Sequence, residues 1–434
     1  MDDGKRMYRF CNKIFPICRS ITGKGVRQTI QAINHNINKV NVQLDVKAIP
    51  SGTPVFDWTI PKEWKIKEAF IEDEYGNRII DFKKNNLHVV SYSTPIDKWV
   101  NLSELKKYIY TQPDQPDVIP YVTSYYKERF GFCMSENQKN TLKPGQYHIF
   151  IDSELFDGVL NYAEAVIPGE STKEVFFSTY FCHPSMANNE CSGPVLASEL
   201  IKYIAKKDYR HYTYRFIFIP ETIGSIAYLS QDNNLKQLQK NMIAGFNLSC
   251  VGDNYDYSIV ESIYGDTLAD RVLKNVLKYH TNGHYSDYSF LSRGSDERQY
   301  NAPGINLPVV CFCRSKFGEF PEYHTSADNM EYVSPEGFQG AYDVMTQVIE
   351  TLEYNNCYKV NVLGEPHLGK RGLYPTVSQK GSYDEVMPLK NLLAYSDGKH
   401  DLISISDKIN VSVSKLIPIV KKLIENNLLE SIHD

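Results

Sequence analysis

The chain has 434 residues, of which 42% are hydrophobic and 23% charged, as in an ordinary globular protein of two or three domains. Its net charge of −5 gives no overall attraction to nucleic acid or to an anionic membrane. The start of the chain, MDDGKRMYRFCNK, is not followed by a continuous apolar stretch, and the nine cysteines are irregularly spaced. These features predict a cytoplasmic protein with reduced thiols and no membrane contact.

The first 170 residues predict helices followed by β-structure. Residues 5–40 are expected to be helical, because Phe10, Ile14 and Ile17 share one face and a second periodic run follows a glycine-rich break. Apolar and polar residues then alternate between prolines, which predicts an inserted β-rich domain over 46–130. Two strand-like runs within 146–169 are expected to form a hairpin.

After residue 170, strands and amphipathic helices alternate. The near-continuous apolar runs 174–181, 215–220, 244–251 and 307–313 are predicted strands. The helices between them are expected over 193–207, from a cap at Ser225, over 266–280, and from Ser334 with Pro335 in the first turn. This pattern predicts a mixed α/β sheet covered by helices on both faces, in a discontinuous domain of residues 1–45 and 131–360.

The end of the chain predicts a separate module over 361–434. A Gly-, Pro- and Ser-rich linker spans 363–382, and three short amphipathic helices follow in a helix-turn-helix-like pattern. Residues 387–434 contain six lysines, no arginine and six acidic residues, so nucleic acid is a poor candidate partner. Protein contact, including homo-oligomer formation through this domain, is the better hypothesis.

Polar side chains follow each predicted strand of the α/β sheet. His183, Asn188, Asn189 and Glu190 follow the first strand, Glu221 the second, Asp253 the third, and His324 and Asp328 the fourth. Ligands of open α/β sheets bind at the carboxyl ends of the strands. Two histidines with several carboxylates are the ligand types that zinc favours in catalytic sites.

Each of these residues also has an ordinary structural interpretation. A histidine after a strand is more often a hydrogen-bonded surface residue than a ligand. Glu221 would stabilise a helix by lying at its N-terminus. Asp253 would serve equally well as a turn residue. The common placement at strand ends, rather than any single residue, carries the prediction of a metal site.

The order of these motifs resembles the zinc-dependent aminopeptidases. The matching stretches are HPS at 183–185, ANNECSG at 187–193, PETIGS at 220–225, FNLSCVGD at 246–253, GSDERQY at 294–300 and EYHTSAD at 322–328. More narrowly, the chain resembles a bacterial group of aminopeptidase-like proteins often linked with polysaccharide biosynthesis. The resemblance covers nearly the whole chain and implies an inserted β domain and a C-terminal winged helix.

The chain departs from the aminopeptidase pattern at four positions. The metal-bridging aspartate of that pattern falls on Asn189, a ligand aspartate on Ser249, the catalytic base on Pro220, and the aspartate that orients the first histidine on Ser185. A neutral amide bridges two divalent cations poorly, because a shared bridge needs negative charge close to both ions.

The resemblance therefore implies a site with one zinc ion, although two ions stay an alternative. His183, Glu190 and His324 are the expected ligands, with one position open for water and Asp253 as a substitute ligand. Glu221 is the expected proton acceptor. The substrate-binding candidates are Asp296, Arg298 and Tyr323, and either Asp296 or Glu297 could bind an amine. The ordinary interpretation of this stretch is a solvated charged loop, which is favoured more for Glu297 than for Asp296 and Arg298.

The leading hypothesis is a metal-dependent hydrolase of the aminopeptidase type. Its substrate would be an amide in a peptide or in an amino-acid-modified sugar. A binding or scaffold protein that has kept the fold but lost turnover is the rival hypothesis, favoured by Asn189, Ser249 and Pro220. An acyl-transfer or cyclisation enzyme with one zinc ion is a third.

Overall fold

The computed structural model describes residues 2–231, 233–373 and 386–432. The chain divides into two compact units, one formed by residues 1–265 and 286–342 and the other by residues 266–285 and 343–434. None of the helices within the described residues is long and apolar enough to cross a membrane.

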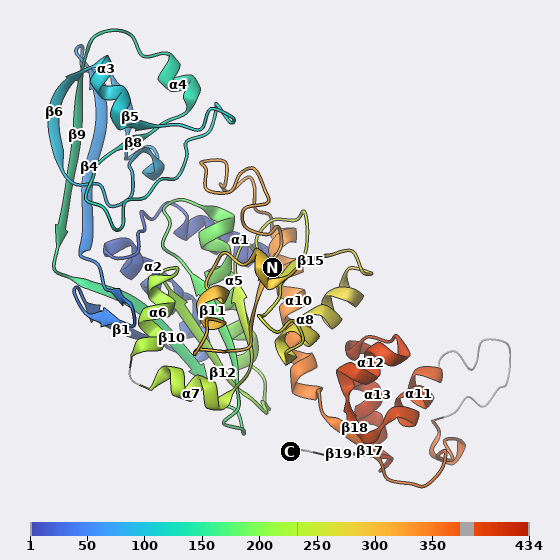
Figure 1. The fold of residues 1–434 in the computed structure, drawn as a ribbon. Helices are drawn as coiled ribbons and strands as arrows, with labels where there is room; N and C mark the ends of the chain where they lie inside the picture. Colours follow the sequence, from blue (N-terminus) through green and yellow to red (C-terminus); the bar gives the residue numbers. More distant parts are fainter. Residues whose placement is uncertain (1, 232, 374–385, 433–434) are drawn as a thin grey trace. The chain divides into compact units, whose positions relative to one another are not determined.

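An eight-stranded sheet forms the centre of the first unit, in the order β1-β10-β12-β11-β13-β16-β14-β15 (Figure 1). The strands are β1 (Asp45–Pro50), β10 (Val159–Ile167), β11 (Glu174–Tyr180), β12 (Thr213–Ile219), β13 (Met242–Leu248), β14 (Ser258–Val260), β15 (Ser286–Tyr288) and β16 (Val309–Cys313). The four central strands β12, β11, β13 and β16 are parallel, and β10 and β14 run antiparallel beside them. The predicted mixed α/β sheet is confirmed.

Helices cover both faces of this sheet. The helices of one face are α1 (Asp3–Ile14), α2 (Lys24–Ile37) and α5 (Ser192–Ala205), and those of the other are α6 (Ile223–Ser230), α7 (Asn234–Asn241) and α9 (Glu297–Tyr300). Phe176 and Tyr180 of β11 pack in one core with Ile226 of α6. Every residue of β11 is buried, as expected for a strand covered on both sides.

The helix α6 begins earlier than predicted. Thr222, rather than Ser225, is its N-cap residue, and the Ser225 hydroxyl donates back to the Thr222 carbonyl from inside the first turn at 2.9 Å. The Thr222 backbone has a positive φ of 64°, which the sequence pattern does not indicate.

A second, four-stranded sheet lies in the same unit, in the order β5-β4-β9-β6. Its strands are β4 (Glu63–Asp73), β5 (Arg78–Asp81), β6 (Ile96–Asn101) and β9 (Gln146–Phe156). The predicted hairpin over 146–169 is wrong, because β9 pairs with β4 and β6 whereas β10 pairs with β1 and β12. Ile149 and Ile151 pack in the core of the small sheet, and Leu160 and Tyr162 in that of the large one, so the two halves serve different cores.

Short elements complete the first unit. They are β2 (Pro54–Val55), β3 (Trp58–Thr59), β7 (Ile109–Tyr110), β8 (Phe132–Cys133), α3 (Leu102–Leu105) and α4 (Glu136–Asn140). An isolated β-bridge joins Pro120 to Thr325, and the Tyr121 backbone N–H donates to the His324 carbonyl at 2.9 Å. The loop that carries His324 is therefore held by a segment about two hundred residues earlier.

The second unit contains helices and a three-stranded sheet in the order β18-β17-β19. Its elements are α8 (Leu268–His280), the part of α10 (Pro335–Tyr354) from residue 343, α11 (Met387–Tyr395), α12 (Leu402–Ile409), α13 (Val413–Glu425), β17 (Cys357–Val360), β18 (Asp397–Asp401) and β19 (Leu429–Ile432). The three short helices predicted near the end of the chain are present as α11, α12 and α13. Residues 374–382 of the predicted linker lie outside the described residues.

Asp401 is a partly buried carboxylate whose contacts predict a pH-dependent stability of the second unit. Its carboxylate accepts two bonds from Arg271, at 2.7 and 2.8 Å, and caps α12 by accepting the Ser404 N–H. Burial alone would raise the pKa of Asp401, but the bonds from Arg271 and Ser404 lower it to about 2.

We expect Asp401→Asn to reduce the free energy of unfolding at pH 7 by about 2 kcal/mol. Because the folded pKa is depressed, this stabilisation is present above the unfolded pKa of about 4 and is lost as pH falls toward 2. Urea unfolding between pH 7 and pH 3 measures the difference between wild type and variant, which should shrink with acidification. Exposed Glu425 supplies the control Glu425→Gln, and a pH-independent difference would contradict the prediction.

Candidate metal centre

The carboxyl ends of the parallel strands β11 and β12 bring two functional candidates to one edge of the sheet. His183 lies three residues after β11 and is 5% exposed, and Glu221 lies two residues after β12. His324 arrives from the loop after β16. All three side chains line one pocket of about 350 Å³.

A buried π-helical turn, Ala187–Cys191, positions Glu190 at the start of α5. The Asp328 carboxylate holds this turn by accepting the backbone N–H groups of Asn188, at 2.6 Å, and Asn189, at 3.0 Å. Single π-helical turns are rare and frequently lie at functional sites. One Glu190 oxygen accepts the Cys182 backbone N–H, and the other contacts Nδ1 of His183.

Cys182, His183 and Glu190 form a buried group in which one ligand atom of each lies within 4.8 Å of the others. The group offers sulfur, nitrogen and oxygen, all of which zinc accepts in proteins. The Glu190 oxygen that faces His183 has only the His183 Nδ1 as a close polar partner within the described part of the chain. Cys182 is the member that the sequence analysis missed, although the dipeptide Cys182-His183 places it beside the first histidine.

His324 lies next to this group. Its ring centroid is 5.0 Å from that of His183, and Tyr323 stacks on it at 3.9 Å. Burial, and then the nearby charge of His183, lowers the pKa of His324 to about 2, so the imidazole is neutral. Its Nε2 is buried and has no hydrogen-bond partner among the described residues, which is the state of a nitrogen available to a metal.

Asp253 lies in a different environment. It is fully buried, and its carboxylate accepts bonds from the Asn188 amide at 2.9 Å, the Ser315 N–H at 3.0 Å and the Ser315 hydroxyl at 2.7 Å. These bonds connect the π-helical turn to the end of β16. Asp253 is not part of the group formed by Cys182, His183 and Glu190.

Glu221 faces the histidines from the end of β12. One carboxylate oxygen accepts the Ser295 hydroxyl at 3.0 Å, and the other lies 3.9 Å from Nε2 of His183. Burial raises the pKa of Glu221 to about 7; the positive charge of His183 opposes this rise, and the negative charge of Glu190 adds to it. Such a carboxyl group both takes and gives a proton near neutral pH.

The stretch GSDERQY contributes mostly buried structural contacts. Asp296 is not among the pocket-lining residues, because its Oδ1 accepts the Thr222 N–H at 2.8 Å and the Ser225 hydroxyl at 2.7 Å. Glu297 is fully buried and accepts the Gly294 N–H at 2.7 Å, so the expected solvated position of Glu297 is wrong.

Arg298 and Tyr323 take different places around the pocket. Arg298 lines the pocket and donates to the Thr222 hydroxyl. Tyr323 lies behind His324 and supports its ring by stacking.

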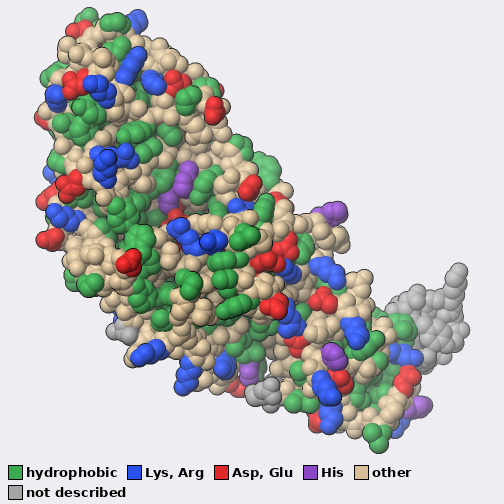
Figure 2. Space-filling view, viewed as in Figure 1, with side chains coloured by type: hydrophobic (Ala, Val, Ile, Leu, Met, Phe, Trp, Pro, Cys, Tyr) green, Lys and Arg blue, Asp and Glu red, His purple; other side chains and the backbone are tan. Residues whose placement is uncertain are grey.

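Aromatic side chains from the region of the small sheet form the opposite wall of the pocket. Trp58, Tyr121, Tyr125 and Tyr126 line it, and Tyr121 contacts both histidine rings, at 4.5 Å from His183 and 5.2 Å from His324. Figure 2 shows histidine side chains inside a hollow of this face, with hydrophobic side chains around them. Sequence reasoning missed this wall because Trp58 comes from the two-residue strand β3 and the three tyrosines come from an irregular segment.

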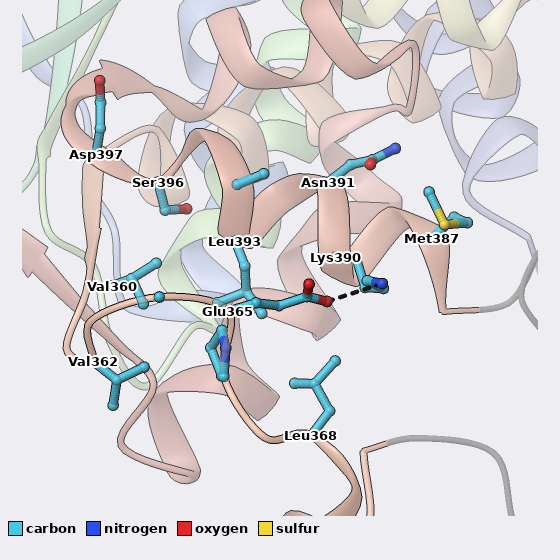
Figure 3. A pocket seen from close by; sticks show the side chains of 13 residues that line it. Val360, Val362, Glu365, Leu368, Met387, Lys390, Asn391, Leu393, Ser396 and Asp397 are labelled. Atoms are coloured by element: carbon cyan, nitrogen blue, oxygen red, sulfur yellow. Dashed lines mark ion pairs between the residues drawn. The ribbon is translucent and has the colours of Figure 1, made fainter.

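A second hollow of about 450 Å³ lies in the second unit between β17 and α11 (Figure 3). Its lining is largely apolar, with one ion pair of 2.9 Å between Lys390 and Glu365. The larger hollow thus lacks the histidines and buried carboxylates of the smaller one, which is the candidate site.

Comparison with protein families identifies two segments. Residues 8–355 match the family described as "Domain of unknown function (DUF4910)", and residues 356–431 match a winged helix-turn-helix family. A Clostridium acetobutylicum protein named as a polysaccharide biosynthesis protein with aminopeptidase-like domain is 43% identical over 410 residues, which are 94% of this chain and 92% of that protein.

Solved structures share the fold. A crystal structure from Clostridium acetobutylicum, described as a peptidase, is 42% identical, covers 99% of this chain and 96% of its own, and has a TM-score of 0.91. A zinc aminopeptidase from Bacillus subtilis is 13% identical and has a TM-score of 0.59. The match covers 80% of this chain and 95% of that aminopeptidase, which shows the common fold. The chain is therefore a member of the DUF4910 family, with an aminopeptidase-like α/β fold followed by a winged helix-turn-helix domain.

Proposed function

We propose that this protein is a zinc-dependent hydrolase of the aminopeptidase type that cleaves an amide bond. The observation that carries the proposal is that His183 contacts Glu190 through Nδ1 and has its ring 5.0 Å from that of His324, whose buried Nε2 has no hydrogen-bond partner among the described residues. A peptide or an amino-acid-modified sugar is the proposed substrate, which agrees with the naming of the Clostridium acetobutylicum relative as a polysaccharide biosynthesis protein with aminopeptidase-like domain.

His183, Glu190 and His324 would hold one zinc ion, which leaves a fourth position for water or substrate. Cys182 lies in the same group, but a fourth protein ligand would close the position left for water, so it is not one of the proposed ligands. When bound, zinc polarises the substrate carbonyl and lowers the pKa of water.

A chain of neutral hydrogen bonds supports one ion rather than two. The Tyr180 hydroxyl lies 2.9 Å from the Asn189 amide nitrogen and 2.5 Å from the Ser249 hydroxyl. Asn189 and Ser249 stand where the resembling aminopeptidases have aspartates. Burial raises the pKa of Tyr180 well above its usual value, so none of the three groups supplies the negative charge that a second divalent ion needs.

Glu221 would move the proton in hydrolysis. Its carboxylate accepts a proton from water as the water oxygen bonds to the carbonyl carbon. As the carbon–nitrogen bond breaks, Glu221 returns that proton to the leaving nitrogen, which yields a carboxylic acid and an amine. The Ser295 hydroxyl orients the carboxylate throughout.

Metal content is the first test. Protein purified without added metal and then incubated with zinc is expected to retain about one zinc per chain by elemental analysis, because one four-coordinate site is formed. His183→Ala and His324→Ala should each lose most of it, whereas the exposed His35→Ala should retain it. Hydrolysis of amino-acid amides should fall in parallel.

Other metal contents would contradict parts of this proposal. Two tightly bound ions would contradict the argument from Tyr180. Absence of zinc in the wild type after incubation would remove the hydrolase proposal and favour a binding or scaffold role.

A further inference from the structure

The Arg298 guanidinium lines the metal-centre pocket, where its charge acts on the Glu221 carboxyl without a direct ion pair among the described residues. Its Nη2 donates to the Thr222 hydroxyl, and its buried Nε has no hydrogen-bond partner. Within the described ranges 2–231, 233–373 and 386–432, no carboxylate forms an ion pair with Arg298. An arginine that is partly removed from water in this way is costly unless an anion reaches it.

Arg215 in the same unit shows the usual alternative. It is 6% exposed, and its guanidinium donates to Glu174, at 2.6 and 2.9 Å, and to Glu164, at 2.6 Å. A buried arginine with a purely structural role is thus neutralised by the protein's own carboxylates. Arg298 differs because its free donors lie in a pocket that is open to a small molecule.

The turn that holds Arg298 is strained. Thr222 has φ 64° and ψ −73°, a conformation that is a genuine outlier for a β-branched residue. Asp296 fixes the turn by accepting the Thr222 N–H, and Arg298 binds the Thr222 hydroxyl. Strain of this kind persists only where surrounding contacts enforce it, and it is concentrated at functional sites.

The contact with Thr222 places the Arg298 guanidinium in the same pocket as Glu221, which limits the ligands that Arg298 can bind. Thr222 directly follows Glu221, and Arg298, Glu221 and His183 line the same pocket of about 350 Å³. An anion on Arg298 would therefore belong to the same small molecule as a carbonyl group beside Glu221. A planar guanidinium fits a carboxylate through two parallel hydrogen bonds.

We propose that Arg298 binds a carboxylate of the substrate, so that the enzyme prefers amides carrying an anionic group close to the cleaved bond. This inference rests on the proposed hydrolase function and specifies its substrate class. The carboxylate has two possible sources, the C-terminus of a short peptide or a sugar acid linked to an amino acid. Exposed Trp58 and Tyr126, with ring centroids 5.5 Å apart at the pocket, offer flat apolar surfaces to either.

The test compares two pairs of substrates that differ in one charge. The first pair is alanyl-alanine and alanyl-alanine amide, and the second is the N-alanyl derivative of 2-amino-2-deoxyglucuronic acid and that of glucosamine. In at least one pair, wild type should cleave the acid with a kcat/KM about 10- to 100-fold above that of the neutral member. Arg298→Gln should lose this preference, because its kcat/KM for the acid falls about 10- to 100-fold further than its kcat/KM for the neutral member, and exposed Arg293→Gln should keep the preference.

The outcomes separate the two proposals. Equal kcat/KM for acid and neutral members in both pairs overturns the role of Arg298 and leaves the hydrolase proposal standing. If no amide is cleaved, the hydrolase proposal fails, and calorimetric binding of the same four compounds decides the inference. Tighter binding of an acid to wild type but not to Arg298→Gln supports it, and equal or absent binding overturns it. The pair that shows the preference identifies the source of the carboxylate.

Discussion

Replacing Glu221 by glutamine is expected to reduce kcat by about 100- to 10,000-fold, the usual contribution of a positioned general base. The substitution keeps the shape of the side chain and its bond from Ser295, but glutamine cannot accept the proton of water. Zinc content should stay at the wild-type value, because Glu221 is not one of the proposed ligands. Hydrolysis of amino-acid amides together with elemental analysis measures both quantities.

A control separates the role of Glu221 from a general effect of charge. Glu319→Gln removes one negative charge from an exposed position that does not line the pocket, and it should keep wild-type kcat. If Glu221→Gln lost zinc as well as activity, Glu221 would be a ligand instead of the proton acceptor. Wild-type activity in Glu221→Gln would eliminate its proposed role.

Arg19→Met is expected to reduce the free energy of unfolding by about 3–5 kcal/mol, because several buried acceptors lose their donor together. Arg19 is 1% exposed and lies between α1 and α2. Its guanidinium donates to the Ile14 carbonyl at 2.7 Å, the His183 carbonyl at 3.2 Å and the Cys191 sulfur at 3.1 Å. Urea unfolding followed by tryptophan fluorescence measures the loss.

Arg19 also connects stability with the metal centre. His183 is a proposed ligand and Cys191 ends the π-helical turn, so the variant should bind zinc more weakly than wild type. Arg293→Met, which changes an exposed arginine in the same way, should unfold like wild type. A loss below about 1 kcal/mol in Arg19→Met would show that water replaces the guanidinium at little cost.

Much of the central architecture could be predicted because it follows from local patterns. The apolar run 174–181 is a strand buried on both faces, and the stretch from Ser334 and Pro335 begins a long helix. Parallel strands end at a common edge, so residues after β11 and β12 had to approach each other. The structure brings His183, Glu221 and His324 to one pocket for this reason.

The parts that sequence reasoning missed depend on contacts between distant segments. The pairing of β9 with β4 was not predicted. The runs that form β9 and β10 are adjacent in the sequence and therefore resemble a hairpin, even though they pack into different cores. Burial of Glu297 was missed because a charged stretch gives no indication of the donors that will surround it. The sequence predicts Asp253 as a substitute ligand, but in the folded chain its carboxylate oxygens accept hydrogen bonds from Asn188 and Ser315, which come from two other segments.

The bridge between Pro120 and Thr325 has a consequence for the order of assembly. Ile119 and Ser326 exchange hydrogen bonds across 207 positions of the chain, next to the residue that presents the second imidazole. Contacts between residues so far apart in the chain are expected to form late in folding, because closing the long intervening loop costs conformational entropy. We therefore expect the folding polypeptide to form its sheet before it completes the proposed metal site.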